Sequence, residues 1–372
     1  MKIDTFGVEM WMNEWETKCE LNLAETCVES LSIAELLRIA DKNETDLSVL
    51  LPLKMTYGEI KGSNRLRNAI AALYDKQSDT NVLVTHGTIG ANMLVHKTLV
   101  ERGDHVVSIV PSYQQHYSIP KSIGAKIDFL QLREGMGWLP DLDELEKLAV
   151  PGTKLIALTN PNNPTGALIP LDMLEGIATI ARRVGAWVLC DEVYRGTDQH
   201  GQGMTTSMAD IYEKGISTAG MSKAYSLAGL RLGWIVAPPA LIEDAMVHRD
   251  YDTISVGVID DHFSTIALES YESLLKRAHN ITRGNLTYLT SWMEGETKLS
   301  WVKPRSGTTA LVKFDLSMSS YDFCIALLQQ TGVMFTPGSA LGMEGYVRIG
   351  YANNPKVLTV GLERVSEFLL RY

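Results

Sequence analysis

The sequence lacks the features that mark several classes of protein. It has no apolar run of about 18 residues or more, which is the length that a membrane-spanning helix requires. Its first residues, Met1 to Phe6, lack the apolar segment of a signal peptide. The four cysteines have neither metal-ligand spacing nor a dense disulfide pattern. We therefore expect a cytoplasmic protein that binds no metal and no membrane.

The sequence also lacks an excess of basic residues. Its formal net charge is −10, so nothing indicates binding to nucleic acid. It contains neither a GxGxxG fingerprint nor a P-loop, which weighs against nicotinamide or ATP as a ligand. What the chain does have is 372 residues, 45% of them hydrophobic and 21% charged, which suits a globular protein with one large domain or two smaller ones.

Short apolar runs alternate with helical patterns through the middle of the chain. The predicted strands are 81–85, 105–110, 126–132, 154–159, 186–190, 216–219 and 233–237. The predicted helices are 63–74, 89–102, 112–122, 141–148, 171–184 and 241–250, with Ser63 and Asp141 as candidate N-caps. Near-continuous apolarity is typical of strands buried on both faces of a parallel sheet, so we predict an α/β sandwich.

The last part of the chain follows a different pattern. A long helix is predicted at 260–293, short strands near 309–315, 334–336 and 346–350, and a final helix near 355–370. This pattern is typical of an α+β unit. We therefore predict a large domain at 46–260 and a smaller domain made of 1–45 and 261–372.

Lys223 and Arg231 lie in one apolar, glycine-containing stretch, Ser222 to Trp234. A lysine amine can form a Schiff base with an aldehyde cofactor, and an arginine can hold the phosphate of that cofactor. Asp191 ends an apolar strand, where a carboxylate is costly unless it is paired. Its partner could be a pyridinium nitrogen, which the carboxylate would keep protonated, or a helix end or a salt bridge.

Three further segments could complete such a site. The run Thr85 to Thr88 follows a strand and begins a helix, where backbone N–H groups can bind a phosphate or simply form a turn. Asn163 lies in Asn-Pro-Asn-Asn-Pro-Thr-Gly, and Tyr194 follows Asp191 closely. Either side chain could donate a hydrogen bond to a phenolic oxygen of the cofactor, although Tyr194 could equally be a half-buried structural residue.

In this order, these motifs resemble the fold-type I, pyridoxal-phosphate-dependent aspartate aminotransferase superfamily, class I and II, over about residues 50–350. The resemblance implies a mainly parallel seven-stranded sheet sandwiched by helices, plus a smaller α+β domain. It implies pyridoxal phosphate as the cofactor. The implied cofactor residues are Lys223 at the Schiff base, Asp191 at the pyridine nitrogen, Asn163 and Tyr194 at the phenolate, Tyr113 on the ring, and Gly87, Thr88 and Arg231 at the phosphate, with Ser222 as a further candidate there.

The resemblance also implies partners and an activity. Tyr57 resembles the tyrosine that reaches the phosphate of the neighbouring subunit, which implies a homodimer with shared active sites. Arg348 resembles the arginine that binds the substrate α-carboxylate in a bidentate manner. The expected reaction transfers the amino group of an L-amino acid to a 2-oxo acid. Lys223 would be the general base, and we expect its surroundings to lower the pKa of its amine.

Some segments depart from this pattern or favour another reaction. Gly220 stands where the family often has a hydroxyl at the phosphate, and Ser222 or Thr218 could replace it. The segments 249–255 and 304–310 are similar to capreomycidine synthase and related enzymes, which cyclise hydroxylated arginine. The alternative activity is therefore a cyclase or lyase on an arginine-like amino acid. Glu9 and Thr26 are candidate substrate residues, with Glu9 either paired with a guanidinium or on a solvated helix face.

Overall fold

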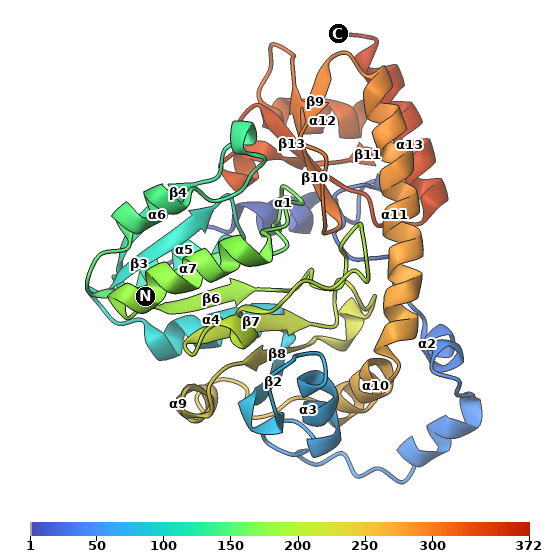
Figure 1. Cartoon of the computed structure of the whole chain (residues 1–372). Helices are drawn as coiled ribbons and strands as arrows, with labels where there is room; N and C mark the ends of the chain where they lie inside the picture. The colour runs from blue at the N-terminus through green and yellow to red at the C-terminus, as the bar shows by residue number, and fades with distance from the viewer. Residues whose placement is uncertain (1) are drawn as a thin grey trace.

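The computed structural model describes residues 2–372. Its largest sheet has seven strands in the order β2-β8-β7-β6-β5-β3-β4 (Figure 1). In chain order these strands are β2 (Val82–His86), β3 (His105–Val110), β4 (Lys126–Gln131), β5 (Thr153–Thr159), β6 (Trp187–Asp191), β7 (Gly215–Gly220) and β8 (Leu232–Val236). Only β8 runs antiparallel to its neighbours β2 and β7 within this sheet. The prediction of a mainly parallel seven-stranded sheet is confirmed.

Both faces of this sheet are covered by helices, as the apolar strands predict. Leu155 and Ala157 of β5 pack with α4 (Gly87–Leu99) and α9 (Pro239–Arg249) on one face. Ile156 and Leu158 pack with α6 (Leu142–Leu148) and α7 (Leu171–Val184) on the other. Because side chains alternate along a strand, a run of consecutive apolar residues supplies both interfaces. Each leucine or isoleucine side chain of this kind contributes about 1.5–3 kcal/mol when it is fully buried.

Local signals set several of the helix ends. The hydroxyl of Ser63 accepts a hydrogen bond from the N–H of Leu66 at the start of α3 (Asn64–Ala71). The carboxylate of Asp141 accepts from two backbone N–H groups at the start of α6. Both predicted N-caps are therefore confirmed. The remaining helices of this part are α5 (Gln115–Ile123) and α8 (Met208–Ile211), with single 3-10 turns at Asp79–Asn81, Glu134–Met136 and Ala228–Leu230.

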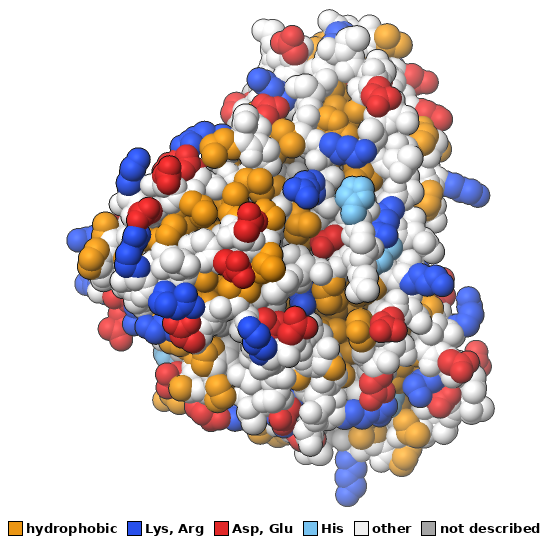
Figure 2. All heavy atoms as spheres, viewed as in Figure 1, with side chains coloured by type: hydrophobic (Ala, Val, Ile, Leu, Met, Phe, Trp, Pro, Cys, Tyr) orange, Lys and Arg blue, Asp and Glu red, His pale blue; other side chains and the backbone are white. Residues whose placement is uncertain are grey.

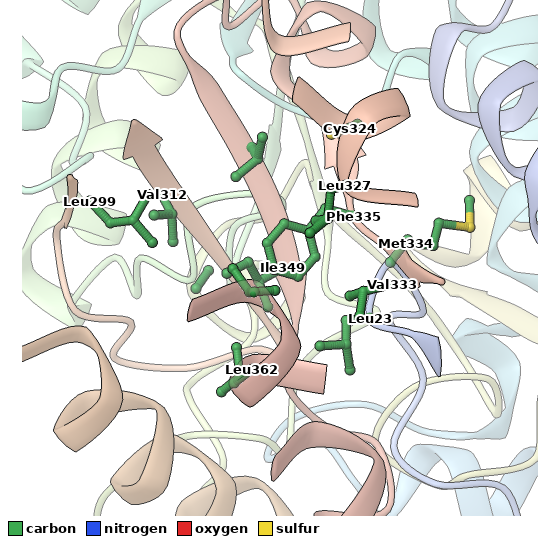
Figure 3. Close-up of a cluster of buried hydrophobic side chains, with 14 of the residues drawn as sticks. Leu23, Leu299, Val312, Cys324, Leu327, Val333, Met334, Phe335, Ile349 and Leu362 are labelled. Carbon is green, nitrogen blue, oxygen red and sulfur yellow. The ribbon is translucent and has the colours of Figure 1, made fainter. Parts of the chain in front are cut away.

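A second, four-stranded antiparallel sheet has the order β12-β13-β10-β9. Its strands are β9 (Leu299–Trp301), β10 (Thr309–Phe314), β12 (Thr336–Pro337) and β13 (Tyr346–Gly350). Helices α12 (Ser320–Thr331) and α13 (Pro355–Leu369) pack on it around a cluster of buried apolar side chains. Figure 3 shows that this cluster draws on β10, β13, both helices and Leu23 from the N-terminal part of the chain.

Two predicted elements of this region are wrong in detail. The single helix predicted at 260–293 is two helices, α10 (Val258–Glu269) and α11 (Tyr271–Gly295), because Ser270 leaves the helical conformation with φ −118° and ψ 24°. The strand predicted near 334–336 is two short strands, β11 (Val333–Met334) and β12, which belong to different sheets. Helix α11 runs along one side of the molecule, from the level of α10 to that of α13 (Figure 1).

The N-terminal segment reaches both sheets. It contains α1 (Gly7–Trp15), β1 (Leu21–Asn22), α2 (Ile33–Ile39) and a 3-10 helix at Glu44–Leu50. Strand β1 pairs with β11, and Leu23 packs in the apolar cluster of the C-terminal sheet. Leu36 and Leu37 of α2 instead pack with Val82 and Trp234 of the seven-stranded sheet. The division of the chain into two domains stays a prediction.

The surface carries charge of both signs. Figure 2 shows acidic and basic side chains interspersed with apolar ones over the visible face. None of the helices within residues 2–372 is both long and apolar enough to cross a membrane.

Candidate active site

A cavity of about 290 Å³ lies where the carboxyl ends of β5, β6 and β7 meet the N-terminal segment and β13. In parallel sheets this edge is the usual place for a ligand. Eleven of the sequence-predicted site residues line the cavity, namely Glu9, Thr26, Thr88, Tyr113, Asn163, Asp191, Tyr194, Ser222, Lys223, Arg231 and Arg348. Gly87 lies behind Thr88 and against Arg231. Tyr57 lies outside the cavity and is 73% exposed.

Lys223 follows β7 and projects its amine into this cavity. Its Nζ donates a hydrogen bond of 2.6 Å to Oγ1 of Thr26 and lies 3.4 Å from Sγ of Cys27. Burial lowers the pKa of the amine, but the neighbouring Cys27, Tyr194 and Glu25 outweigh burial and raise the pKa above its usual value. The expectation of a lowered pKa is therefore wrong, because the groups around the amine stabilise its charged form.

Asp191 ends β6 and is held from two sides. Its Oδ2 accepts a hydrogen bond of 2.8 Å from the amide of Asn92 and lies 3.4 Å from Nε2 of His116. Its Oδ1 accepts from the N–H of Val193. Because these donors fix the carboxylate and satisfy Oδ2, Oδ1 keeps the capacity to accept a further donor from the cavity. Sequence reasoning missed Asn92, for which the one signal is a polar residue among the apolar positions of α4.

The first turn of α4 and Arg231 bring hydrogen-bond donors together at one side of the cavity. Gly87 begins the helix with φ +66°, and Oγ1 of Thr88 is buried without a hydrogen-bond partner among the described residues. A Cβ at Gly87 would lie 3.2 Å from a guanidinium nitrogen of Arg231, so the glycine lets the arginine approach the helix end. Arg231 itself has a left-handed backbone, with φ +47°. A helix N-terminus, an unpartnered hydroxyl and a guanidinium form the donor set that a phosphate group needs.

The structure distinguishes the two candidates for the missing hydroxyl at Gly220. The hydroxyl of Thr218 donates to Oδ1 of Asn92 at 2.6 Å and is therefore engaged elsewhere. Ser222 lines the cavity. At Gly220 itself, a Cβ would lie 2.6 Å from Oγ1 of Thr88, so the close approach of β7 and α4 requires glycine there.

Arg348 of β13 is 3% exposed and lines the opposite side of the cavity. Its terminal nitrogens donate to Oδ1 of Asn163, the carbonyl of Ala24 and Oγ1 of Thr336 at 3.1–3.2 Å. Its Nε has no partner among the described residues. Burial lowers the pKa of this guanidinium, since none of its direct partners is charged. The side chain is thus fixed in place and keeps donors for an anionic ligand.

Besides Asp191, three carboxylates line the same cavity, those of Glu9, Glu16 and Glu25. Glu9 accepts a hydrogen bond of 2.8 Å from the hydroxyl of Tyr113, so it lies in the cavity and the interpretation as a solvated helix face is wrong. Burial and the neighbouring Glu25 and Glu9 raise the pKa of Glu16. Sequence reasoning missed Glu16, although it shares a helical face with Glu9 two turns earlier.

Glu25 is the carboxylate most tightly bound to the protein. It accepts hydrogen bonds from the backbone N–H groups of Thr26 and Cys27 at 2.6 and 2.7 Å. Burial raises the pKa of Glu25, but the charge of Lys223 and these hydrogen bonds outweigh burial and lower it. Glu25 is therefore ionised at neutral pH and faces the lysine amine.

Comparison with known proteins agrees with this geometry. The family model described as aminotransferase class I and II matches residues 52–365. The chain belongs to the class I and II aminotransferase family. It is therefore an enzyme, and pyridoxal phosphate is its cofactor. The donors at Thr88 and Arg231 and the carboxylate of Asp191 fit the phosphate and the ring nitrogen of this cofactor.

The individual relatives divide between two kinds of enzyme. A crystal structure of a PLP-dependent aminotransferase from Streptococcus suis is 40% identical, with a TM-score of 0.97 over 100% of this chain and 99% of that one. Capreomycidine synthase of Streptomyces vinaceus is 28% identical over 97% of this chain and 93% of its own length. The PLP-dependent cyclase OrfR is 26% identical, with a TM-score of 0.91 over 100% of this chain and 98% of that one.

Proposed function

We propose that the protein is an aminotransferase that takes the amino group of an L-amino acid and delivers it to a 2-oxo acid. One observation carries the proposal. Lys223, Asp191 and Arg348, from three separate parts of the chain, line a single cavity. An amine, a buried carboxylate and a buried guanidinium are the groups that this chemistry needs at the α-carbon, at the cofactor ring and at the α-carboxylate.

Different residues of the chain would bind different parts of the cofactor. When bound, pyridoxal phosphate supplies an aldehyde that condenses with amines and a ring that accepts the electrons released at the α-carbon. Asp191 would keep the ring nitrogen protonated, and Thr88, Ser222 and Arg231 would bind the phosphate with Gly87. Asn163 and Tyr194 would bind the phenolic oxygen, and Tyr113 would cover the ring.

The remaining residues act on the substrate. Arg348 binds the α-carboxylate and so orients the α-carbon towards Lys223. The lysine amine then removes the α-proton and would return it to the aldehyde carbon of the cofactor. General base catalysis typically contributes about 10²–10⁴-fold in rate to such a step. The amine must be neutral when it accepts the proton, so the bound cofactor and substrate would have to offset the groups that raise its pKa.

We also propose a homodimer in which Tyr57 completes the site of the neighbouring subunit. Tyr57 is exposed and lies outside the cavity of its own chain, and Leu51 and Met55 of the same segment are 88% and 77% exposed. Large apolar side chains gathered on one exposed segment are typical of an interface.

A second candidate reaction is cyclisation or elimination on an arginine-like amino acid. The observation that favours it is the group of carboxylates Glu9, Glu16 and Glu25 in the cavity. The cations Lys223 and Arg348 already have roles at the α-carbon and the carboxylate, so a substrate with a cationic side chain would balance these acids. Capreomycidine synthase and the cyclase OrfR are the relatives that support this alternative.

A single-turnover assay separates the two reactions. The enzyme loaded with pyridoxal phosphate is incubated with single amino acids, including arginine and hydroxyarginine, without any 2-oxo acid, and the products are measured by mass spectrometry. An aminotransferase will form one 2-oxo acid per site and then stop until an acceptor is added. Repeated turnover without an acceptor will establish the cyclase or lyase reaction. No product from any amino acid will overturn both.

Steady-state kinetics with cationic and uncharged amino acids test the acidic residues. For a cationic substrate, Glu9→Gln should raise KM about tenfold or more, which is the effect of losing one hydrogen bond to a charged group. Its KM for an uncharged amino acid should not change. Glu14→Gln, at an exposed position of the same helix, is the matched control. Equal effects of Glu9→Gln on both kinds of substrate will contradict a cationic substrate.

A further inference from the structure

A chain of two buried histidines extends from Asp191 into the protein, away from the cavity. His116 on α5 lies with Nε2 3.4 Å from Oδ2 of Asp191. Behind it, Nε2 of His96 on α4 lies 3.4 Å from Nδ1 of His116. Both histidines are 0% exposed. His96 does not line the cavity, so it cannot touch a ligand there.

We propose that His96 is a positioning residue that fixes the tautomer of His116, and through it the hydrogen bond to Asp191. The inference rests on the proposed role of Asp191 at the ring nitrogen. It assigns His96 a function in the same site, although it contacts neither cofactor nor substrate.

The hydrogen-bonding capacity of imidazole determines the arrangement. A neutral imidazole has one N–H donor and one acceptor nitrogen. Among the described residues, Nδ1 of His116 has one partner, Nε2 of His96. When His96 donates from Nε2, Nδ1 of His116 must accept, so the one proton of a neutral His116 lies at Nε2, where it can be donated to Asp191. The carboxylate favours this tautomer, and His96 excludes the other. With His96 as donor, the opposite tautomer of His116 would place two N–H groups against each other.

The environment of His96 keeps it in the neutral form that this arrangement uses. Burial, and secondarily His116, hold the pKa of His96 well below its usual value. Asn92, one turn earlier on α4, is the second donor to Oδ2 of Asp191, and Thr218 in turn donates to it. The two helices α4 and α5 thus each bring one donor to the same carboxylate oxygen.

Packing alone does not explain a histidine at this position. Nδ1 of His96 is buried and has no partner among the described residues. A buried nitrogen without a partner destabilises a protein, whereas an aliphatic side chain would have no such group. Within residues 2–372, the contact with His116 is the single polar interaction that the imidazole makes.

The test compares His96→Leu with His96→Gln, because a glutamine amide can still donate to Nδ1 of His116. Nitrogen NMR of the full chain with labelled histidine, loaded with pyridoxal phosphate, reports which nitrogen of His116 carries the proton. Wild-type protein and His96→Gln should show His116 protonated at Nε2. His96→Leu should show a mixture of tautomers and about a tenfold lower kcat, which is the scale for outer hydrogen-bond partners of a functional group. Val95→Ala, a buried neighbour on α4, should lower stability without changing the tautomer.

Two results would overturn the proposal. One is a wild-type His116 that carries its proton at Nδ1, and the other is an unchanged tautomer in His96→Leu. Spectra recorded before loading separate this inference from the proposed function. If the chain fails to bind pyridoxal phosphate, the proposed role of Asp191 at the ring nitrogen is wrong. The tautomer of His116 in the unloaded protein still tests whether His96 positions it.

Discussion

At the residue scale, the surroundings of Lys223 have opposing effects on the pKa of its amine. The amine is enclosed by the protein, which disfavours its charge, yet Glu25 faces it and is itself ionised. Thr26 and Cys27, which contact the amine, both donate their backbone N–H groups to Glu25. The segment 25–27 therefore controls the charge of the lysine as well as its position.

This arrangement predicts the effect of Glu25→Gln on cofactor uptake. Glutamine can still accept the two backbone hydrogen bonds, but it removes the negative charge that raises the pKa of Lys223. The lysine pKa should fall, and each unit of decrease makes the neutral amine about tenfold more abundant at a pH below the pKa. The rate at which pyridoxal phosphate attaches to the lysine, measured by absorbance, should therefore begin to rise at a lower pH than in the wild type.

A matched control for this variant is Glu20→Gln. Glu20 has a side chain that is 70% exposed and pairs with Arg364, and it does not line the cavity. Its pH profile should coincide with that of the wild type. A profile of Glu25→Gln that is unchanged, or shifted to higher pH, would show that Glu25 does not raise the lysine pKa.

At the scale of elements, the close contact between β7 and the start of α4 determines where the phosphate donors lie. A Cβ at Gly220 would lie 2.6 Å from Oγ1 of Thr88 and 3.0 Å from the carbonyl of Leu232. Neither the α4 turn nor the antiparallel partner β8 can move without changing the sheet. The hydroxyl that related enzymes often carry at this position is thus incompatible with the packing of this chain.

We therefore predict that Gly220→Ala weakens both folding and cofactor binding. Overpacking of this kind typically costs about 1–3 kcal/mol, and displacement of Thr88 should additionally raise the Kd for pyridoxal phosphate. Thermal unfolding and a fluorescence titration with the cofactor measure the two effects. Gly229→Ala is the control, because a Cβ there meets nothing within 4 Å. An unchanged Kd in Gly220→Ala would show that Thr88 is not a phosphate ligand.

The elements were largely predictable from sequence, whereas their side-chain contacts were not. The strands of the large sheet are buried on both faces, and this constraint leaves a continuous apolar pattern in the sequence. The break at Ser270 and the pairing of β11 with β1 leave no such pattern, because tertiary contacts determine them. Asn92 likewise acquires its role only when α4 is placed behind Asp191, a relation that sequence spacing does not contain.

At the scale of the whole molecule, the proposed role of Tyr57 requires a second copy of the chain. The cavity brings together residues from the N-terminal segment, the large sheet and β13, yet Tyr57 projects from a separate exposed segment. Buried Arg249 donates hydrogen bonds to the backbone carbonyls of Val84 and Ile60. It thereby connects the segment that follows Tyr57 to β2, the strand that precedes Gly87 and Thr88. Because this segment is anchored to β2 and Tyr57 is exposed, the tyrosine can contact a neighbouring molecule.

Subunit mixing tests this arrangement directly. Tyr57→Ala and Lys223→Ala homodimers should both lose activity, the first through weak phosphate binding and the second through loss of the general base. In a heterodimer of the two variants, one site should combine an intact Lys223 with the partner's intact Tyr57, because each site of the proposed two-fold dimer takes Tyr57 from the other chain. Heterodimers isolated with two different affinity tags should therefore recover about half of the wild-type activity per dimer. If Tyr57 acts within its own subunit, neither site of the heterodimer is complete and mixing should restore nothing.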